Sequence, residues 1–340
     1  MTKPHLVVTA SPHLKAPAST PVIMWTVVAS MVPIAAASFY FFGISALLVV
    51  AASLAGALAT EAALGSRLTL PDGSAVITGV LLGFTLPASL PLWMAFVGGA
   101  VSIGFGKWIF GGLGYNIFNP ALLGRAFLMA AFPVPLTTWP ALPSSVWQLA
   151  GDNFALPLMS ADPAAMVTAA TPLGLAKFEG TATAALPLIF GNVGGSLGET
   201  SALVILICGA YLAWRGFLNW RTPASIFASV AVISGLLHVI DPKYPGPLFM
   251  LFSGGLVLGA VYMATDMVTS PTTNRGRWIF GAGIGLLVVV IRVWGGLPEA
   301  VMFAILLMNA LVPLINRSTQ PRVFGTPGRT RRLRTPEVAA

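Results

Sequence analysis

The chain has 340 residues, of which 56% are hydrophobic and only 8% are charged. Soluble domains carry about a quarter charged residues, so this composition excludes an ordinary globular protein. Repeated apolar runs near the length of a bilayer crossing instead predict an all-α polytopic membrane protein. The single cysteine, Cys208, excludes a disulfide framework and any CxxC motif on this chain, and the three histidines are too dispersed for a metal site.

The N-terminal part of the chain predicts a short tail followed by five membrane segments. Residues 1–21 form a polar tail that contains proline, serine and two lysines. The first half, residues 22–135, contains apolar runs at 22–42, 44–64, 75–86, 92–110 and 121–134. The third run is short and continues into Leu86-Pro87-Ala88-Ser89, so we expect a broken helix there.

A long polar interval, residues 136–199, separates this half from a second one at residues 200–316. The second half contains apolar runs at 200–214, 224–240, 248–265, 278–293 and 300–315. The total is about ten transmembrane helices. Residues 317–340 form an arginine-rich tail that can bind anionic lipid or a partner subunit. Nucleic acid is a poor partner for this tail because only Phe324 accompanies its arginines.

The distribution of lysine and arginine predicts the orientation in the membrane. The net charge is +8. With both termini in the cytoplasm, fifteen of the eighteen basic residues lie on the inner side, and only Lys177, Lys243 and Arg292 lie outside. The opposite orientation would reverse this ratio, which the positive-inside rule disfavours. The interval 136–199 is therefore predicted to be extracytoplasmic.

Short internal matches indicate that the two halves are inverted repeats. Gly79–Gly83 matches Gly255–Gly259 in sequence, and Phe110–Leu113 matches Trp294–Leu297. The matched segments cross the membrane in opposite senses, as in five-plus-five inverted repeats that place sites near interrupted helices. A contrary match, Gly106–Gly111 with Gly276–Gly281, falls out of this register.

The glycine-rich run Gly191–Thr200 has two interpretations. Ser196 and Glu199 have the spacing of a capping box that would begin the sixth segment. The same run, with Gly194 and Gly195, can also expose backbone N–H groups to a phosphate or the edge of a flavin.

Two further polar runs border membrane segments. In Gly111–Pro120 and just after it, Asn116, Asn119 and Arg125 lie at the mouth of a short segment, where polar groups usually face a cavity, a partner or a ligand. Between the eighth and ninth segments, Asp266 and the hydroxyl residues Thr269, Ser270, Thr272 and Thr273 are more than helix capping requires. A cation or the ring nitrogen of a cofactor is a possible ligand. Glu61, Glu299 and His238 lie near segment ends, where solvation is common, and are assigned no role.

Three of these runs together resemble the NqrB/RnfD family of membrane flavoproteins, which belong to ion-pumping redox complexes. They are Phe110–Ala121, Gly194–Leu203 and Thr269–Arg277, and the resemblance extends over about residues 22–317. The compact length is more similar to the Rnf branch of the family than to the quinone-reductase branch.

The resemblance implies a covalent cofactor at Thr171. In this family a flavin transferase outside the cytoplasm attaches FMN through a phosphoester to the last threonine of a Ser/Thr-Gly-Ala-Thr pattern. Thr168-Ala169-Ala170-Thr171 fits that pattern at three positions, with Ala169 in place of glycine and the upstream acid, Asp162, at an unusual distance. A second, non-covalent riboflavin is also implied.

As a whole, the resemblance implies an electron-transfer subunit of a ferredoxin:NAD+ oxidoreductase (Rnf) complex in the bacterial inner membrane, coupled to Na+ or H+ movement. The flavin carries the chemistry, so no catalytic side chain is expected. Partner subunits with flavin and iron–sulfur groups would hold the NAD and ferredoxin sites, since the chain lacks a GxGxxG motif and a cysteine cluster. The B subunit of a sodium-pumping NADH:quinone reductase, a urea- or ammonium-channel-like transporter and a scaffold subunit stay open as alternatives.

Overall fold

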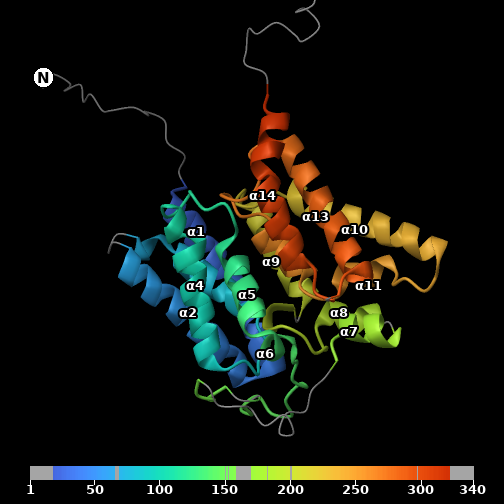
Figure 1. The fold of residues 1–340 in the computed structure, drawn as a ribbon, viewed down its shortest axis with the longest axis horizontal. Helices are drawn as coiled ribbons and strands as arrows, with labels where there is room; N and C mark the ends of the chain where they lie inside the picture. Colours follow the sequence, from blue (N-terminus) through green and yellow to red (C-terminus); the bar gives the residue numbers. More distant parts are fainter. Residues whose placement is uncertain are drawn as a thin grey trace, which may run out of the picture.

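The computed structural model of the chain is built from helices (Figure 1). It describes residues 18–65, 69–149, 151, 153–157, 170–181, 183–199, 201–296 and 298–321. Within these ranges, the first half contains α1 (Thr20–Phe42), α2 (Ile44–Leu64), η1 (Leu70–Asp72), α3 (Ser74–Phe84), α4 (Leu92–Gly106), η2 (Trp108–Phe110) and α5 (Pro120–Ala131).

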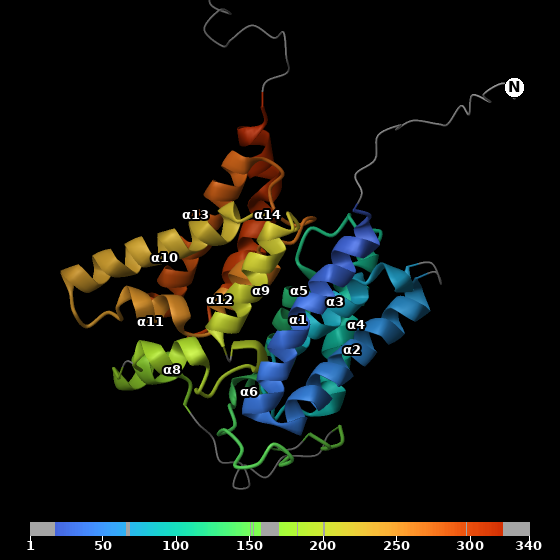
Figure 2. The same cartoon turned by 180° about the vertical axis from the view of Figure 1, so that it is seen from behind.

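Short elements connect this half to the second one. They are α6 (Pro133–Thr137), α7 (Pro172–Gly174), the π-helical turn η4 (Leu175–Glu179), α8 (Ala185–Phe190) and η5 (Leu197–Glu199). The second half contains α9 (Ala202–Trp214), α10 (Arg221–Ile240), α11 (Pro247–Phe252), α12 (Leu256–Leu258), η6 (Gly259–Met263), α13 (Asn274–Trp294) and α14 (Val301–Thr319). Seen from behind, α9 lies between α1 and the rest of the second half (Figure 2).

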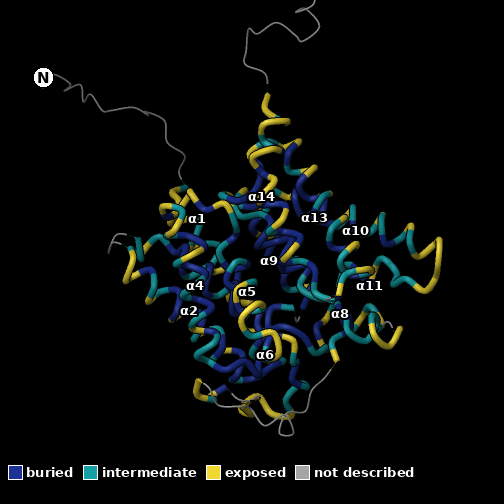
Figure 3. Tube along the Cα trace, viewed as in Figure 1, coloured by how far each residue is buried: buried dark blue, intermediate teal, exposed yellow. Residues whose placement is uncertain are grey.

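The all-α polytopic membrane fold predicted from the composition is confirmed. Six of the described helical segments are long and apolar enough to cross a membrane: Thr20–Phe42, Ile44–Leu64, Leu92–Phe110, Arg221–Ile240, Asn274–Trp294 and Val301–Thr319. Three shorter apolar helices, α3, α5 and α9, lie among them. Large apolar side chains such as Tyr40, Trp214 and Val239 are exposed at the periphery, whereas the middle of the molecule is buried (Figure 3). A surface of this kind suits lipid rather than water. The number of ten crossings stays a prediction.

The two halves use the same kind of helix packing. In the first half, α2 packs against α4, where a Cβ atom on Gly99 would lie 2.1 Å from the carbonyl oxygen of Ser53. In the second half, α10 packs against α13, where a Cβ atom on Gly285 would lie 1.8 Å from Ser229 Oγ. Small residues let the helix backbones approach closely in membranes. The corresponding helices of the predicted repeats are therefore paired in the same way.

Each half also contains an interrupted helix at its third segment. The first follows α3, where the buried backbone of residues 85–91 receives hydrogen bonds from Asn153 Nδ2 to the carbonyls of Ala88 (2.9 Å) and Leu90 (3.0 Å). The second was predicted as one segment, residues 248–265, and this prediction is wrong. The chain turns at Ser253–Gly255 between α11 and α12, and Gly254 has a φ of 63° that a residue with a side chain rarely adopts.

The first and the last described helices begin and end on the same side of the molecule. The start of α1 and the end of α14 are both at the top of Figure 1, and the segment that follows α6 is at the bottom. The polar interval between the halves therefore begins on the side opposite the start of α1 and the end of α14.

Candidate functional site

Thr171 lies at the start of the short helix α7. Its backbone is extended (φ −70°, ψ 153°), and its Oγ1 accepts a hydrogen bond from the N–H of Gly174 at 3.1 Å. Pro172 follows at the first helical position, where its fixed φ fits and its missing N–H is not needed. The threonine is half-buried, while Pro172 and Leu173 are buried. Thr168 and Ala169 lie outside the described residues.

The glycine-rich run lies beside Thr171. One cavity, with about 380 Å³ of empty space, is lined by Thr171, Gly194, Gly195, Ser196 and Glu199, together with Glu299. Ser196 is buried, and its Oγ has no hydrogen-bond partner among the described residues. Two segments separated by more than twenty residues in sequence therefore meet at one small polar cavity.

The predicted capping box at this run is present only in part. Glu199 Oε2 accepts from the Ser196 N–H at 3.3 Å, as the motif requires, but the two residues enclose the 3₁₀ turn η5. Helix α9 begins three residues later, and its cap is Ser201, whose Oγ accepts from the Val204 N–H at 3.4 Å. The prediction that Ser196 caps the sixth segment is wrong. Because Ser201 caps α9, the Ser196 hydroxyl is not used as a helix cap and can bind a ligand.

Arg125 and Glu299 form an ion pair that connects the two halves. Arg125 lies on α5, and its guanidinium Nη2 donates to Glu299 Oε2 just before α14. Burial raises the pKa of Glu299 to about 7; Arg125 acts against this rise and Glu199 adds to it. Glu299 was predicted to be a solvated residue at a segment end, and the structure shows instead that it is largely enclosed and paired.

Arg292 is a further cation on this side of the molecule, and the sequence analysis gave it no role at a site. It is 5% exposed and lies in the last turn of α13. Its Nη1 donates to the carbonyl of Met250 at 2.6 Å and its Nη2 to that of Ser253 at 2.8 Å. A second cavity with Arg125, Ser196, Glu199, Arg292 and Glu299 in its lining adjoins the one at Thr171. The signal in the sequence was an arginine inside an apolar segment.

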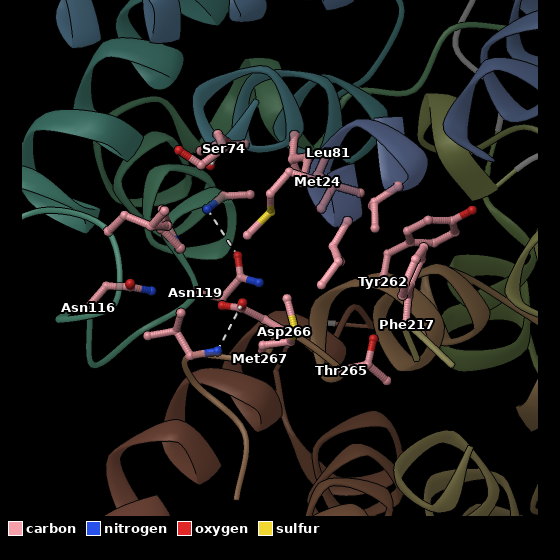
Figure 4. A pocket seen from close by; sticks show the side chains of 18 of the residues that line it. Met24, Ser74, Leu81, Asn116, Asn119, Phe217, Tyr262, Thr265, Asp266 and Met267 are labelled. Carbon is pink, nitrogen blue, oxygen red and sulfur yellow. Dashed lines mark hydrogen bonds between the residues drawn. The ribbon is translucent and has the colours of Figure 1, made fainter. Parts of the chain in front are cut away.

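The asparagines and Asp266 meet at a different cavity (Figure 4). It has about 860 Å³ of empty space between α1, α3, α5, α9 and the segment after η6. Asn119 caps α5 by accepting from the N–H groups of Ala121 (3.0 Å) and Leu122 (3.3 Å), and its Nδ2 donates to the Met263 carbonyl at 3.2 Å. Asn116, Lys107 and Tyr262 also line this cavity.

Asp266 faces the cavity from the other half of the molecule. Its Oδ1 accepts from the Val268 N–H at 3.3 Å and its Oδ2 from Thr269 Oγ1 at 3.0 Å. Burial raises the pKa of Asp266, and these two hydrogen bonds act against the rise. Thr269 thus orients the carboxyl group, and Asn116, Asn119 and Asp266 all line the same cavity.

Thr272 and Thr273, which belong to the same predicted run as Asp266, do not line this cavity. Thr273 caps α13, with its Oγ1 accepting from the Gly276 N–H at 3.0 Å, and it lies 2.6 Å from Thr319 Oγ1. The Thr272 N–H donates to Asn316 Oδ1 at 3.1 Å. Both residues connect the start of α13 to the end of α14. Their contacts are explained by capping and helix packing.

Comparison with known proteins identifies the family of the chain. Residues 7–325 match the model of the NQR2, RnfD, RnfE family. The D component of the ion-translocating oxidoreductase complex of Stutzerimonas stutzeri is 43% identical over 331 residues, which are 92% of this chain and 94% of that protein. The D component of the Na(+)-translocating ferredoxin:NAD(+) oxidoreductase complex of Acetobacterium woodii is 39% identical, over 96% of this chain and 97% of that protein.

A third relative, the D component of the proton-translocating ferredoxin:NAD(+) oxidoreductase complex of Clostridium ljungdahlii, is 38% identical over 94% of this chain and 96% of that protein. The match of the family model covers nearly the whole chain, including both halves and the polar interval between them. The chain therefore belongs to the NQR2, RnfD, RnfE family of membrane proteins.

Proposed function

We propose that this chain is the D component of an ion-translocating ferredoxin:NAD+ oxidoreductase of the Rnf type. The similar proteins that carry this name are matched over nearly their whole length, which favours this assignment over the B component of a quinone reductase. Other flavin and iron–sulfur subunits of the complex are its partners, and the bacterial inner membrane is its location. The chain supplies binding and orientation, while bound flavin supplies one- and two-electron transfer.

Thr171 is the attachment residue for a covalent FMN in this proposal. The observation that carries it is the shared cavity of Thr171 and the glycine-rich run, in which the buried Ser196 hydroxyl has no partner among the described residues. A phosphoester on Thr171 Oγ1 would bring anionic oxygens to this cavity, where Ser196 Oγ can donate a hydrogen bond. The Thr171 oxygen already accepts from the Gly174 N–H, an interaction that an ester oxygen can retain.

The charges around this cavity fit an added phosphate. Glu199 and Glu299 are balanced by Arg125 and Arg292 in the adjoining cavity. One more negative charge would favour the protonated form of Glu299, whose pKa is already raised to about 7. A carboxyl group with this pKa can exchange a proton as the charge at the cavity changes, which suits coupling of electron transfer to cation movement.

The larger cavity is proposed to hold a second, non-covalent riboflavin. Its lining is mostly apolar with a few convergent polar groups, as in most cofactor sites. The amides of Asn116 and Asn119 and the carboxyl group of Asp266 can hydrogen-bond the edge of a flavin ring or its ribityl hydroxyls. The two flavin sites would then lie on opposite sides of the interrupted helices and form part of an electron relay.

In-gel fluorescence tests the covalent FMN. The chain is coexpressed with a flavin transferase, purified and run on a denaturing gel that retains only covalent flavin. We expect a fluorescent band that Thr171→Ala abolishes and that the matched control Thr168→Ala leaves unchanged.

The same gel identifies the alternatives. A fully processed wild-type sample without fluorescence would overturn the covalent flavin and favour a transporter or a scaffold subunit. If Thr168→Ala removes the signal and Thr171→Ala does not, the attachment residue is misassigned while the flavoprotein function stands.

A further inference from the structure

A fourth cavity collects every basic residue that the topology predicts outside the cytoplasm. Its lining includes Lys177, Lys243 and Arg292, and it has about 610 Å³ of empty space that opens to the surface. Lys177 comes from η4, Lys243 from the turn after α10, and Arg292 from the end of α13. These elements lie together on the right of Figure 1, near α8 and α11.

The backbone groups around this cavity fix two of the three cations. Lys177 Nζ donates to the carbonyls of Arg292, at 3.2 Å, and Gly295. The Arg292 guanidinium uses Nη1 and Nη2 to bind two carbonyls, and its buried Nε has no partner among the described residues. Lys243 is exposed at the rim. Among the described residues, the lining contains three cations and no carboxylate.

The first half of the molecule contains a buried cation that is paired with carboxylates rather than with backbone carbonyls. Lys107, at the end of α4, is 3% exposed, and its Nζ lies 2.8 Å from Glu61 Oε1 and 3.8 Å from Asp72 Oδ2. It also donates to Ser74 Oγ at the start of α3. In the second half, Arg292 occupies a comparable place near the end of α13 and contacts the interrupted third segment. Arg292 also lines the neighbouring cavity, with Glu199 and Glu299, but neither glutamate lines the cavity of Lys177 and Lys243.

The rim of the cavity has the character of a membrane interface. Tyr244 and Phe249 line the cavity, and the ring of Tyr244 lies 6.3 Å from that of Trp294. Ile240 and Leu248, on either side of the turn, are 78% and 59% exposed. Tyrosine and tryptophan gather at headgroup depth, where an apolar tail and a phosphate are both within reach.

We infer that Lys177, Lys243 and Arg292 bind the phosphate of an anionic phospholipid headgroup. This lipid would lie in the leaflet opposite the start of α1 and the end of α14. The exposed apolar residues beside the rim would contact the acyl chains. Basic residues near anionic lipid strengthen binding by roughly a factor of five each. This site requires no flavin and stands independently of the proposed redox function.

Native mass spectrometry of the full-length chain in mild detergent tests this inference. The chain is titrated with phosphatidylglycerol and, separately, with phosphatidylcholine. We expect one phosphatidylglycerol to bind in preference to phosphatidylcholine, and Lys177→Gln/Lys243→Gln to weaken it about 30-fold. The matched control is Arg215→Gln/Arg221→Gln, which removes two basic residues that instead stack on Phe217 and Trp220 and should bind as the wild type does.

A second measurement on the wild type covers the case in which the variant misfolds. Phosphatidylglycerol should protect Lys177 and Lys243 from acetylation, and inorganic phosphate is tested in parallel. Protection by phosphate alone would support a phosphate site and assign it to a free anion rather than a lipid. Equal binding of both lipids without protection of the lysines would overturn the site, as would a correctly folded double variant that binds as tightly as the wild type.

Discussion

Glu61 and Lys107 form a buried ion pair at the ends of α2 and α4. Neither side chain is more than 4% exposed, and Trp108 Nε1 donates to the second Glu61 oxygen at 3.0 Å. The carboxylate thus has partners for both oxygens, and the ammonium has Glu61, Asp72 and Ser74. A buried charge is tolerated only with such partners, because its desolvation is costly.

Removing one partner of this pair should cost more unfolding free energy than replacing both. Glu61→Gln leaves the Lys107 charge buried with only the more distant Asp72, and breaking a buried pair typically costs about 3–5 kcal/mol of unfolding free energy. Replacing both residues, as in Glu61→Met/Lys107→Met, removes the charges together and should cost much less. Thermal unfolding can be followed with a thiol-reactive dye, since Cys208 is the only cysteine and is buried.

The melting temperatures of the two variants test whether the pair acts mainly by neutralising a buried charge. Glu61→Gln should lower the melting temperature more than the double variant does. If the double variant melts lower than the single one, the pair contributes more than charge neutralisation, and the interpretation is wrong.

Ion pairs of this kind show where sequence patterns stop being informative. Position near a segment end predicted solvation for Glu61 and Glu299, yet both are paired with residues far away in sequence, Lys107 and Arg125. The apolar runs and the positive-inside rule give no information on which helices lie side by side. The group of Asn116, Asn119 and Asp266 could be suspected from their cost near the membrane, but the shared cavity required the fold.

At the scale of the helices, glycines set the distance between α2 and α4. Gly56 and Gly99 face each other's helix so closely that added Cβ atoms would lie 2.0 Å from the Phe96 carbonyl oxygen and 2.1 Å from that of Ser53. Gly104, on the same α4 helix, would place its Cβ at an ordinary 3.7 Å from Thr60 Cγ2. Gly104 is therefore a matched control for a substitution at Gly99 on the same helix.

Alanine substitutions at Gly99 and Gly104 should have opposite effects. Gly99→Ala forces α2 and α4 apart and should lower the melting temperature by several degrees. Gly104→Ala has room for its methyl group and gains helix propensity of about 1 kcal/mol, so it should be neutral or stabilising. The same dye measurement compares them, and equal destabilisation by both would contradict close packing at Gly99.

The positions of the helices followed well from apolar runs, and their interruptions did so less well. The second segment was predicted at residues 44–64, and α2 has those bounds. The fifth was predicted to reach residue 134, but α5 ends at Ala131 and Pro133 begins α6. The break after α11 was missed because Ser253–Gly255 lies in an otherwise apolar run. Only the backbone conformation at Gly254 and the Arg292 hydrogen bonds reveal it.

For the molecule as a whole, orientation decides what every cavity can contact. If both termini lie in the cytoplasm, Thr171 faces the outer side, where the proposed flavin transferase acts, and the cavity of Lys177, Lys243 and Arg292 faces the outer leaflet. The start of α1 and the end of α14 lie at one end of the bundle, as this topology requires (Figure 1). The direction itself rests on the distribution of basic residues.

Cysteine labelling tests this direction. In a Cys208→Ser background, Ser145→Cys lies in the exposed segment after α6, and Ser318→Cys lies at the exposed end of α14. A membrane-impermeant maleimide added to spheroplasts should label the cysteine at position 145 directly and the one at 318 only after permeabilisation, because the fold separates the two positions across the bundle. The reverse pattern would place Thr171 in the cytoplasm, out of reach of an extracytoplasmic transferase. It would also move the cavity of Lys177, Lys243 and Arg292 to the inner leaflet, where anionic headgroups would be available to it as well. The labelling result therefore separates the covalent flavin, which depends on orientation, from the phosphate site, which does not.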